Sequence, residues 1–570
     1  MPLSWIDAQK AVFDPGSGTP FELTETEVRG VRMEVFRNAP PNLALALQNA
    51  RNHGDATFLI YEGERYSFAR LMDEVDGLCH ALVHRYGVQK GDRVAVAMRN
   101  YPEWIIAFAA IVSVGAINVS FNAWWTEDEM DFALKDSGAK VLIGDQQRID
   151  TAHHSCRELG VRMLIARPER ETGPDIDVWS DAVKPGLGPI VADISPDDDC
   201  TILYTSGTTG RPKGAVSTHR AVVNSLLAFS ARNQVLALAS DPDEKMLAES
   251  KWPTSFILIV PLFHVTGCVP VMLSCFVAGL KLVIMYKWDA GKALPIIQEE
   301  RITNFVGVPT QSWDLVNHPD FDKFDTSSLK AVGGGGAPAP ATLVDKVAKS
   351  IKGGGPQLGY GMTETNAFGP GNVGKFYLER PTSTGRVSRP MELAVWDPVT
   401  KTPLGPNEYG EIMMFGPMLI RGYWNRPDAT AETIENGWLH TGDGGYIDDD
   451  GFLFIKDRIK DMILRGGENV FCTEVEGSIY EHPAVHEAAV FGVPHERLGE
   501  EVAVAIKPND GVAFTAEDLW KFLDGKISSF KVPNHVVIIN EPLPRNAAGK
   551  FLKTALRDGV ANGTLTPTSR

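Results

Sequence analysis

Strand patterns alternate with helical patterns over much of the chain, and this alternation limits the folds that it can adopt. From about residue 45 to 200, residues 93–98 and 140–144 have the apolar composition of buried strands, and residues 102–114 between them have a helical period. Similar strands recur at residues 256–260, 280–284 and 304–308. Strands that alternate with helices predict a parallel sheet with helices on both faces.

The pattern changes twice towards the C-terminus. From about 383 to 458, short strands separated by glycine, proline and aspartate predict a β-rich subdomain. From about 461, helical and strand patterns predict a small α+β unit. A length of 570 residues is also typical of several domains with ample core. We therefore expect an α/β fold with an N-terminal domain over 1–459, which includes the β-rich part, and a C-terminal domain over 460–570.

The stretch 205–214 follows apolar residues 202–204 and predicts a loop that leaves a buried strand. It holds three glycines, four hydroxyl side chains and two cations within ten residues. Glycines let a backbone turn its N–H groups towards an anion, and hydroxyls and cations add donors, so the loop suits a polyphosphate. A plain Ser/Gly linker is the alternative, and the Pro-Lys-Gly order excludes a Walker A loop. The candidate phosphate ligands are Thr205, Ser206, Gly207, Thr208, Thr209, Gly210 and Lys213.

Further motifs follow in order at residues 335–338, 360–364, 441–443, 456–461 and 546–550. Together with residues 204–214, they resemble the AMP-forming, adenylate-forming superfamily. Its members include acyl-CoA synthetases, adenylation domains of peptide synthetases and beetle luciferases. The resemblance covers about residues 45–555 and implies a small, mobile C-terminal domain that rotates about a hinge near Lys460.

The resemblance also implies how ATP is held. Thr363 is expected to contact the α-phosphate, Tyr360 to stack on adenine and Asp443 to bind ribose. Glu364 is the expected Mg²⁺ ligand, because a carboxylate beside a phosphate is repulsive unless a cation lies between them. The motifs have plainer alternatives: a helix start at Thr363, a turn at Asp443 and a solvated charge run at 456–461. The other expected nucleotide contacts are Gly335, Gly336, Ala337, Pro338, Gly361, Met362, Arg458 and Lys460.

Catalysis and thioester formation are expected to need additional residues. By resemblance, Lys550 bridges the carboxylate, the α-phosphate and the ribose during adenylation, together with Lys213, Thr363 and Glu364. Gly466 and Gly467 resemble a glycine loop along the pantetheine tunnel for coenzyme A. Phe530 and Lys531 lie where some relatives contact the nucleotide of coenzyme A.

The acid pocket is expected to be apolar. His264 resembles a residue beside the acyl carboxylate, although a core histidine is the alternative. The remaining candidates are Val308, Gly333, Gly334, Gly335, Gly359, Gly361 and Met362. Small side chains suggest room for a medium- or long-chain fatty acid or an arylalkanoic acid. We find no Arg or Lys clearly placed for a second carboxylate, which favours an apolar acid over a dicarboxylic one.

These features favour an acyl-CoA synthetase that uses ATP, Mg²⁺ and coenzyme A. The alternatives are an acyl-AMP ligase that loads a carrier protein and a non-catalytic acyl-nucleotide sensor. The formal charge of −17 disfavours nucleic acid as a partner. Scattered cysteines, no signal peptide and an apolar run at 269–280 that is too short to span a bilayer favour a cytoplasmic protein. The oligomeric state is left open, with a homodimer among the options.

Overall fold

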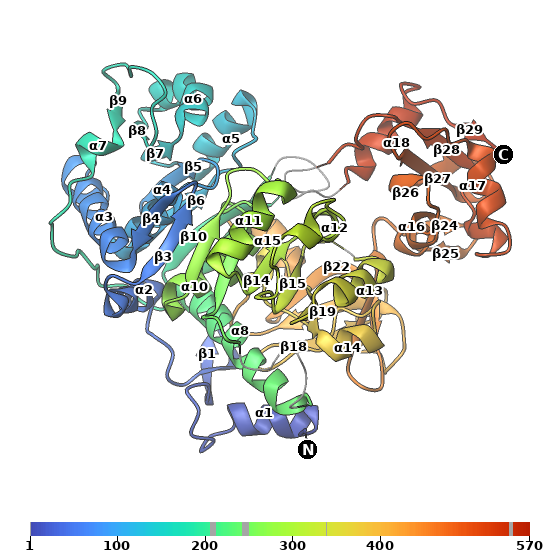
Figure 1. Cartoon of the computed structure of the whole chain (residues 1–570), viewed down its shortest axis with the longest axis horizontal. Helices are drawn as coiled ribbons and strands as arrows, with labels where there is room; N and C mark the ends of the chain where they lie inside the picture. The colour runs from blue at the N-terminus through green and yellow to red at the C-terminus, as the bar shows by residue number, and fades with distance from the viewer. Residues whose placement is uncertain (1, 206–211, 242–249, 338, 546–550) are drawn as a thin grey trace.

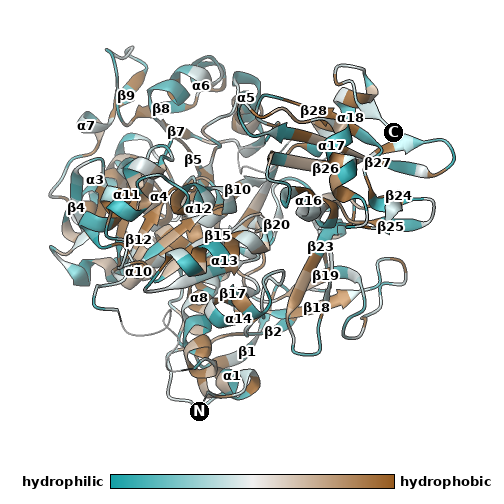
Figure 2. Cartoon of the chain, turned by 45° about the vertical axis from the view of Figure 1, so that its right-hand side comes forward, coloured by the Kyte–Doolittle hydropathy of each residue, from teal (hydrophilic) through white to brown (hydrophobic). Residues whose placement is uncertain are grey.

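The computed structural model describes residues 2–205, 212–241, 250–337, 339–545 and 551–570. A large α/β unit and a β-rich subdomain are joined to a small C-terminal unit that lies to one side (Figure 1). The strands at the centre of the large unit are mostly hydrophobic, whereas its outer helices carry hydrophilic faces (Figure 2). The α/β fold class predicted from the sequence is confirmed.

The first of two eight-stranded sheets runs in the order β20-β11-β10-β6-β5-β7-β8-β9. The strands from β10 to β9 are parallel, and β11 and β20 extend one edge in antiparallel pairing. Their bounds are β5 (Arg93–Ala97), β6 (Ile117–Ser120), β7 (Val141–Gly144), β8 (Arg162–Ile165), β9 (Ile176–Val178), β10 (Asp199–Thr205), β11 (Lys213–Thr218) and β20 (Gly422–Tyr423).

The second sheet runs in the order β17-β16-β15-β14-β12-β13-β3-β4. It is parallel from β16 to β3, and β17 and β4 are antiparallel strands at its two edges. Their bounds are β3 (Thr57–Tyr61), β4 (Glu64–Ser67), β12 (Ser255–Leu258), β13 (Lys281–Ile284), β14 (Asn304–Gly307), β15 (Ala331–Gly335), β16 (Gly355–Gly359) and β17 (Gly371–Val373).

Helices separate the two sheets and cover their outer faces. The central layer contains α2 (Leu43–Gln48), α3 (Phe68–His80), α4 (Pro102–Ser113), part of α8 (His219–Ala239) and the helical run that ends in α10 (Ser274–Ala278). The first sheet is covered outside by α5 (Glu127–Ser137) and α6 (Gln146–Leu159), and the second by α11 (Ala290–Glu300), α12 (Pro309–Val316) and α13 (Ala341–Ser350). Both sheets therefore have helices on both faces, as the alternation predicts.

Two further sheets complete the chain. The β-rich subdomain pairs β18 (Glu392–Trp396), β19 (Gly410–Phe415), β21 (Ile434–Glu435), β22 (Trp438–Ile447) and β23 (Leu453–Arg458). The C-terminal unit pairs β24 (Ile463–Arg465), β25 (Glu468–Val470), β26 (Val485–His495), β27 (Gly499–Pro508), β28 (His535–Ile538) and β29 (Thr568–Ser569). Its sheet lies between α16 (Cys472–Tyr480) and α17 (Ala516–Leu523) on one face and α18 (Lys553–Ala561) on the other.

Shorter elements lie around these layers. They are α1 (Trp5–Phe13), the hairpin of β1 (Leu23–Val28) and β2 (Val31–Phe36), α7 (Trp179–Ala182), α9 (Val265–Gly267), α14 (Gly374–Glu379) and α15 (Pro427–Thr433). The apolar run predicted at 269–280 is helical and mostly buried, as expected of a core segment. In the described part of the chain, no helix is both long enough and apolar enough to cross a membrane.

A buried histidine at the start of α8 predicts a loss of stability in acid. His219 is 0% exposed, its Nδ1 accepts from Leu43 N at 3.2 Å, and burial lowers its pKa to about 4. The unfolded chain therefore takes up a proton first, and the contribution of neutral His219 is lost as the pH falls from about 6.5 towards 4. The expected loss is about 3 kcal/mol in the free energy of unfolding.

Urea unfolding at pH 7.5 and pH 5 would measure about 2 kcal/mol of this loss, the part that develops between pH 6.5 and 5. The variant His219→Gln cannot take up the proton, so its stability should fall less between the two pH values, although it starts lower. An equal fall in both proteins would show that the histidine does not titrate on unfolding.

Candidate active site

Four of the predicted site residues follow neighbouring parallel strands of the second sheet. Val308 comes directly after β14, Gly335 and Gly359 end β15 and β16, and His264 lies in the connection after β12. Because β12, β14, β15 and β16 are adjacent and parallel, their carboxyl ends meet at one edge of the sheet. Ligands of open α/β sheets bind at this edge. His264 is half-buried, and its Nδ1 accepts from Thr266 N at 3.2 Å.

A second group of residues forms at the edge of the first sheet. The predicted loop 205–214 joins the hairpin of β10 and β11, so Lys213 begins a strand and pairs with Thr205, contrary to the prediction of a loop through residue 214. Lys213 Nζ lies 5.1 Å from the ring centroid of Tyr423. The Tyr423 hydroxyl donates to Glu364 Oε1 at 2.6 Å, and Glu364 is only 6% exposed. A cation and a buried carboxylate therefore flank one tyrosine ring.

No pattern in the sequence singles out Tyr423. It sits near the end of an apolar run, where an aromatic residue predicts only core packing. Burial and the Glu364 carboxylate raise the pKa of Tyr423, so its hydroxyl stays protonated and remains a donor. The backbone of the same segment also holds Glu364, because Ile420 N donates to Glu364 O at 2.9 Å. Glu364 is thus held once through its carboxylate and once through its backbone.

A third group links the second sheet to the β-rich subdomain. The Tyr360 hydroxyl donates to Asp443 Oδ2 at 2.5 Å, and Arg458 Nε lies 3.5 Å from Asp443 Oδ1. Asp443 and Arg458 are paired across β22 and β23. Burial and the Asp443 carboxylate raise the pKa of Tyr360 well above its usual value. Three predicted nucleotide contacts therefore lie together around one carboxylate.

The plainer interpretations of these motifs differ from the geometry. Thr363 begins a single 3₁₀ turn whose preceding residue is Met362, so Thr363 is not a helix cap. Asp443 lies inside β22, so it is not a turn aspartate. Arg458 is paired with Asp443, whereas Lys460 is exposed in the turn after β23. The expected solvated charge run is therefore broken by a specific contact.

The glycines of the expected acid pocket have a structural reason to be small. A Cβ at Gly333 would collide with the carbonyl oxygen of Gln357, and one at Gly334 with that of Gly307. The same holds for Gly335 against Gly359 and for Gly361 against Ala367. These collisions are with backbone, which cannot move aside cheaply. Close packing of the strands therefore requires glycine at these positions, and the room that they leave for an acid stays a prediction.

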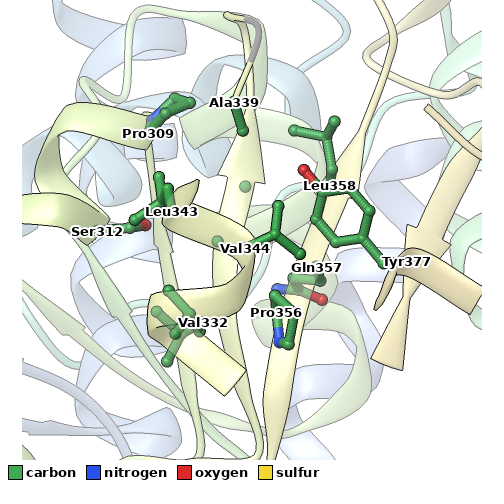
Figure 3. A pocket seen from close by; sticks show the side chains of 13 residues that line it. Pro309, Ser312, Val332, Ala339, Leu343, Val344, Pro356, Gln357, Leu358 and Tyr377 are labelled. Carbon is green, nitrogen blue, oxygen red and sulfur yellow. The ribbon is translucent and has the colours of Figure 1, made fainter. Parts of the chain in front are cut away.

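A small cavity lies between the strands β15 and β16 and the helices α12 and α13 (Figure 3). It is lined mainly by apolar side chains, and Tyr377 closes one side of it. Of the predicted pocket residues, only Gly333 and Gly334 line it. The cavity therefore does not gather the residues predicted to bind an acid.

The residues expected to contact coenzyme A lie in the C-terminal unit. Gly466 and Gly467 form the two-residue turn between β24 and β25, and both have positive φ angles, which glycine adopts without strain. Phe530 and Lys531 lie in a short 3₁₀ turn. Lys531 Nζ contacts Glu474 Oε1 at 2.6 Å, so its charge is paired in this arrangement of the chain.

The remaining predicted site residues need separate mention. Gly336 and Ala337 follow β15. Within the described residues, no cluster of three or more His, Cys, Asp or Glu side chains could hold a metal ion by itself. Seven predicted site residues lie outside the described part of the chain: Ser206, Gly207, Thr208, Thr209, Gly210, Pro338 and Lys550.

Family comparisons agree with this arrangement of elements. Residues 47–424 match the family model of the AMP-binding enzyme, and residues 474–550 match that of the AMP-binding enzyme C-terminal domain. The first match covers the first two groups of contacts and Tyr360 of the third, but ends before Asp443 and Arg458.

Two curated relatives and one solved structure are similar over nearly their whole length. A feruloyl-CoA synthase of Amycolatopsis sp is 33% identical over 512 residues, which is 90% of this chain and 97% of the relative. A long-chain-fatty-acid–CoA ligase of Bacillus subtilis is 31% identical over 90% of this chain and 93% of its own. The structure of o-succinylbenzoate CoA synthetase from Bacillus subtilis with its acyl-adenylate intermediate has a TM-score of 0.77 and 28% identity, covering 91% of this chain and 98% of that one.

Proposed function

The chain belongs to the AMP-binding enzyme family as an AMP-forming carboxylic acid–CoA ligase, and on that premise we propose that it activates a hydrophobic acid. ATP and the acid would give acyl-AMP and pyrophosphate, and coenzyme A would then displace AMP to give the thioester. The substrate would be a medium- or long-chain fatty acid or an arylalkanoic acid. The names of the relatives, which include feruloyl-CoA and long-chain-fatty-acid enzymes, support this range.

The observation that carries the proposal is the gathering of cations and carboxylates from distant segments. Lys213 and Glu364 meet around Tyr423, and Tyr360 and Arg458 meet around Asp443. We assign the first group to the phosphates of ATP and the second to its adenosine. To activate a carboxylate, the enzyme must position the phosphates of ATP and neutralise their charge. Preorganised charged groups can do both.

Glu364 is our proposed ligand for Mg²⁺. Mg²⁺ binds through one or two carboxylates together with substrate phosphates, so a single buried carboxylate with one oxygen left free by Tyr423 fits it. Bound there, Mg²⁺ would neutralise phosphate charge. Thr363 next to it would contact the α-phosphate, and Lys213 would bind the outer phosphates.

We also propose that the C-terminal unit turns about Lys460 between the two half-reactions. Lys460 is exposed in the short connection between β23 and β24, where a change of backbone angles disturbs little packing. In the first arrangement Lys550 would reach the reacting carboxylate. In the second, Gly466 and Gly467 would line the path of pantetheine, with Phe530 and Lys531 near the nucleotide of coenzyme A.

The test of the function is product analysis. Mass spectrometry would follow reactions with ATP, Mg²⁺, coenzyme A and a panel of fatty acids, benzoates, cinnamates and arylalkanoates. AMP with an acyl-CoA is the expected result. Acyl-AMP without thioester would favour a carrier protein as acceptor, and ATP binding without turnover would favour a sensor.

The assignment of Asp443 to ribose predicts a change in ATP affinity. Asp443→Asn keeps one acceptor oxygen but loses the charge that strengthens hydrogen bonds to the ribose hydroxyls, so KM for ATP should rise about 10-fold. Steady-state kinetics with varied ATP would measure it. Asp448→Asn, in a turn of the same subdomain, is the matched control and should leave KM unchanged. Equal KM values for all three proteins would contradict the assignment.

A further inference from the structure

Arg232, on helix α8, has few partners for a guanidinium. Its Cζ lies 5.2 Å from the ring centroid of Phe229 and 5.5 Å from that of Phe368. Nη1 donates to Gly369 O at 3.0 Å, whereas Nε has no hydrogen-bond partner. Within the described part of the chain, no carboxylate forms an ion pair with it. Among the described residues, its polar and cation–π contacts are therefore two aromatic rings and one carbonyl oxygen.

Holding a cation away from water costs free energy unless acceptors satisfy its N–H groups. Desolvation lowers the pKa of Arg232 to about 10, and no charged neighbour counteracts this. A buried charge is ordinarily paired or fully hydrogen-bonded, because its removal from water is otherwise uncompensated. Cation–π contacts offset part of that cost and leave Nε without an acceptor.

The guanidinium lies on a face of the second sheet that is open beside it. A Cβ at Gly371 on β17 would lie 2.7 Å from Arg232 Nη1, so a larger residue there would displace the guanidinium. Gly371 is paired with Gly359 on β16, and paired residues of antiparallel strands face the same side. At Gly359, a Cβ would meet nothing closer than Gly334 O at 4.0 Å. Arg232 and the open space at Gly359, a residue of the expected acid pocket, therefore lie on the same side of the sheet.

The connection between β16 and β17 relates Arg232 to the proposed reaction centre. It folds back on itself, because Tyr360 N donates to Pro370 O at 2.9 Å and Gly361 packs against Ala367. Thr363 and Glu364 lie at its tip, and Gly359 and Gly371 at its base beside Arg232. The four residues from Gly359 to Thr363 span at most about 14 Å. The base of the connection, where Gly371 faces Arg232, therefore lies within a short chain length of the proposed phosphate and metal ligands.

We propose that Arg232 is a specificity-determining residue that binds an oxygen acceptor at the far end of the acid, opposite the carboxyl group that is activated. The inference rests on the proposed function and narrows its substrate class. The acid would be compact, such as an arylalkanoic acid with a ring oxygen or a medium-chain acid with a terminal oxygen. It departs from the expectation that no Arg or Lys is clearly placed for a second carboxylate.

The experiment compares matched acids in the wild type and Arg232→Met. The pairs are cinnamate with 4-hydroxycinnamate and 4-carboxycinnamate, and octanoate with 8-hydroxyoctanoate and octanedioate. The neutral and anionic members distinguish a hydroxyl from a carboxylate as the acceptor. Arg220→Met, on the same helix but paired with Asp197, is the matched control, and Arg232→Lys keeps the charge.

The readout is the ratio of kcat/KM within each pair, which does not depend on how much enzyme is folded. In the wild type, a substituted acid should exceed its parent by about 10-fold, because Arg232 is partly buried, its Nε is shielded from water, and an unmade hydrogen bond to such a cation is costly. Arg232→Met should reduce this ratio to about 1, Arg232→Lys should restore part of it and Arg220→Met should keep it.

Two results would overturn the inference. One is a wild type that uses the parent acids as well as the substituted ones, which leaves the proposed function intact. The other is a preference that survives in Arg232→Met. If no acid yields AMP with any protein, the proposed function itself fails, and the inference falls with it.

Discussion

Replacement of Glu364 by glutamine is expected to slow acyl-adenylate formation about 100-fold or more, because a preorganised charge at the phosphates is lost. The substitution keeps the shape of the side chain and the acceptor that Tyr423 uses at 2.6 Å. It removes only the negative charge proposed to hold Mg²⁺. Pyrophosphate exchange into ATP, measured across a range of Mg²⁺ concentrations, reports this step without coenzyme A.

The variant Tyr423→Phe distinguishes the effect of the charge of Glu364 from the effect of its position. It keeps the Glu364 carboxylate but removes its hydrogen bond, so we expect a loss of about 10-fold that high Mg²⁺ partly restores. Glu364→Gln should not be restored by Mg²⁺, because its charge is absent. If Glu364→Gln retained exchange activity close to that of the wild type, Glu364 would not be the metal ligand. A folding defect would instead appear as a lowered Tm.

The layered α/β part of the fold follows directly from the sequence, because each of its elements carries its own periodic signal. The strand predicted at 93–98 is β5, and the helix predicted at 102–114 is α4. Both are buried over nearly their whole length, so apolar composition alone reveals them. The β-rich subdomain and the C-terminal unit were likewise marked by a change in that signal. Local pattern is sufficient wherever an element is defined by the face it buries.

What the sequence hides depends on contacts between distant segments. Tyr423 lies 59 residues from Glu364 along the chain, and nothing in its neighbourhood distinguishes it from a core aromatic. Arg232 is an ordinary polar residue on a helix until Gly369 and Gly371 are folded against it. The packing reason for glycine at position 333 is likewise invisible in the sequence, because the collision comes from Gln357 on the next strand. The function of these residues depends on which distant residues they contact, and the periodicity of the sequence does not report such contacts.

The second large effect is expected from Lys550→Ala. The lysine is proposed to reach the carboxylate and the α-phosphate as charge develops between them, and loss of one such group costs about 100- to 1,000-fold in rate. The rate of adenylation, measured by pyrophosphate exchange, should therefore fall by this factor. Thioester formation from synthetic acyl-AMP and coenzyme A should continue at nearly the wild-type rate, because the proposed turn of the C-terminal unit would then carry Lys550 away from the substrate.

Measuring both half-reactions distinguishes a specific role of Lys550 from a general defect. A damaged fold would lower both rates together, and an uninvolved lysine would lower neither. Lys521→Ala, on α17 of the same unit, is the matched control and should leave both rates unchanged. If Lys550→Ala slowed thioester formation as much as adenylation, the lysine would act in both arrangements. That outcome would argue against a turn about Lys460 and in favour of a C-terminal unit that keeps one position throughout the reaction.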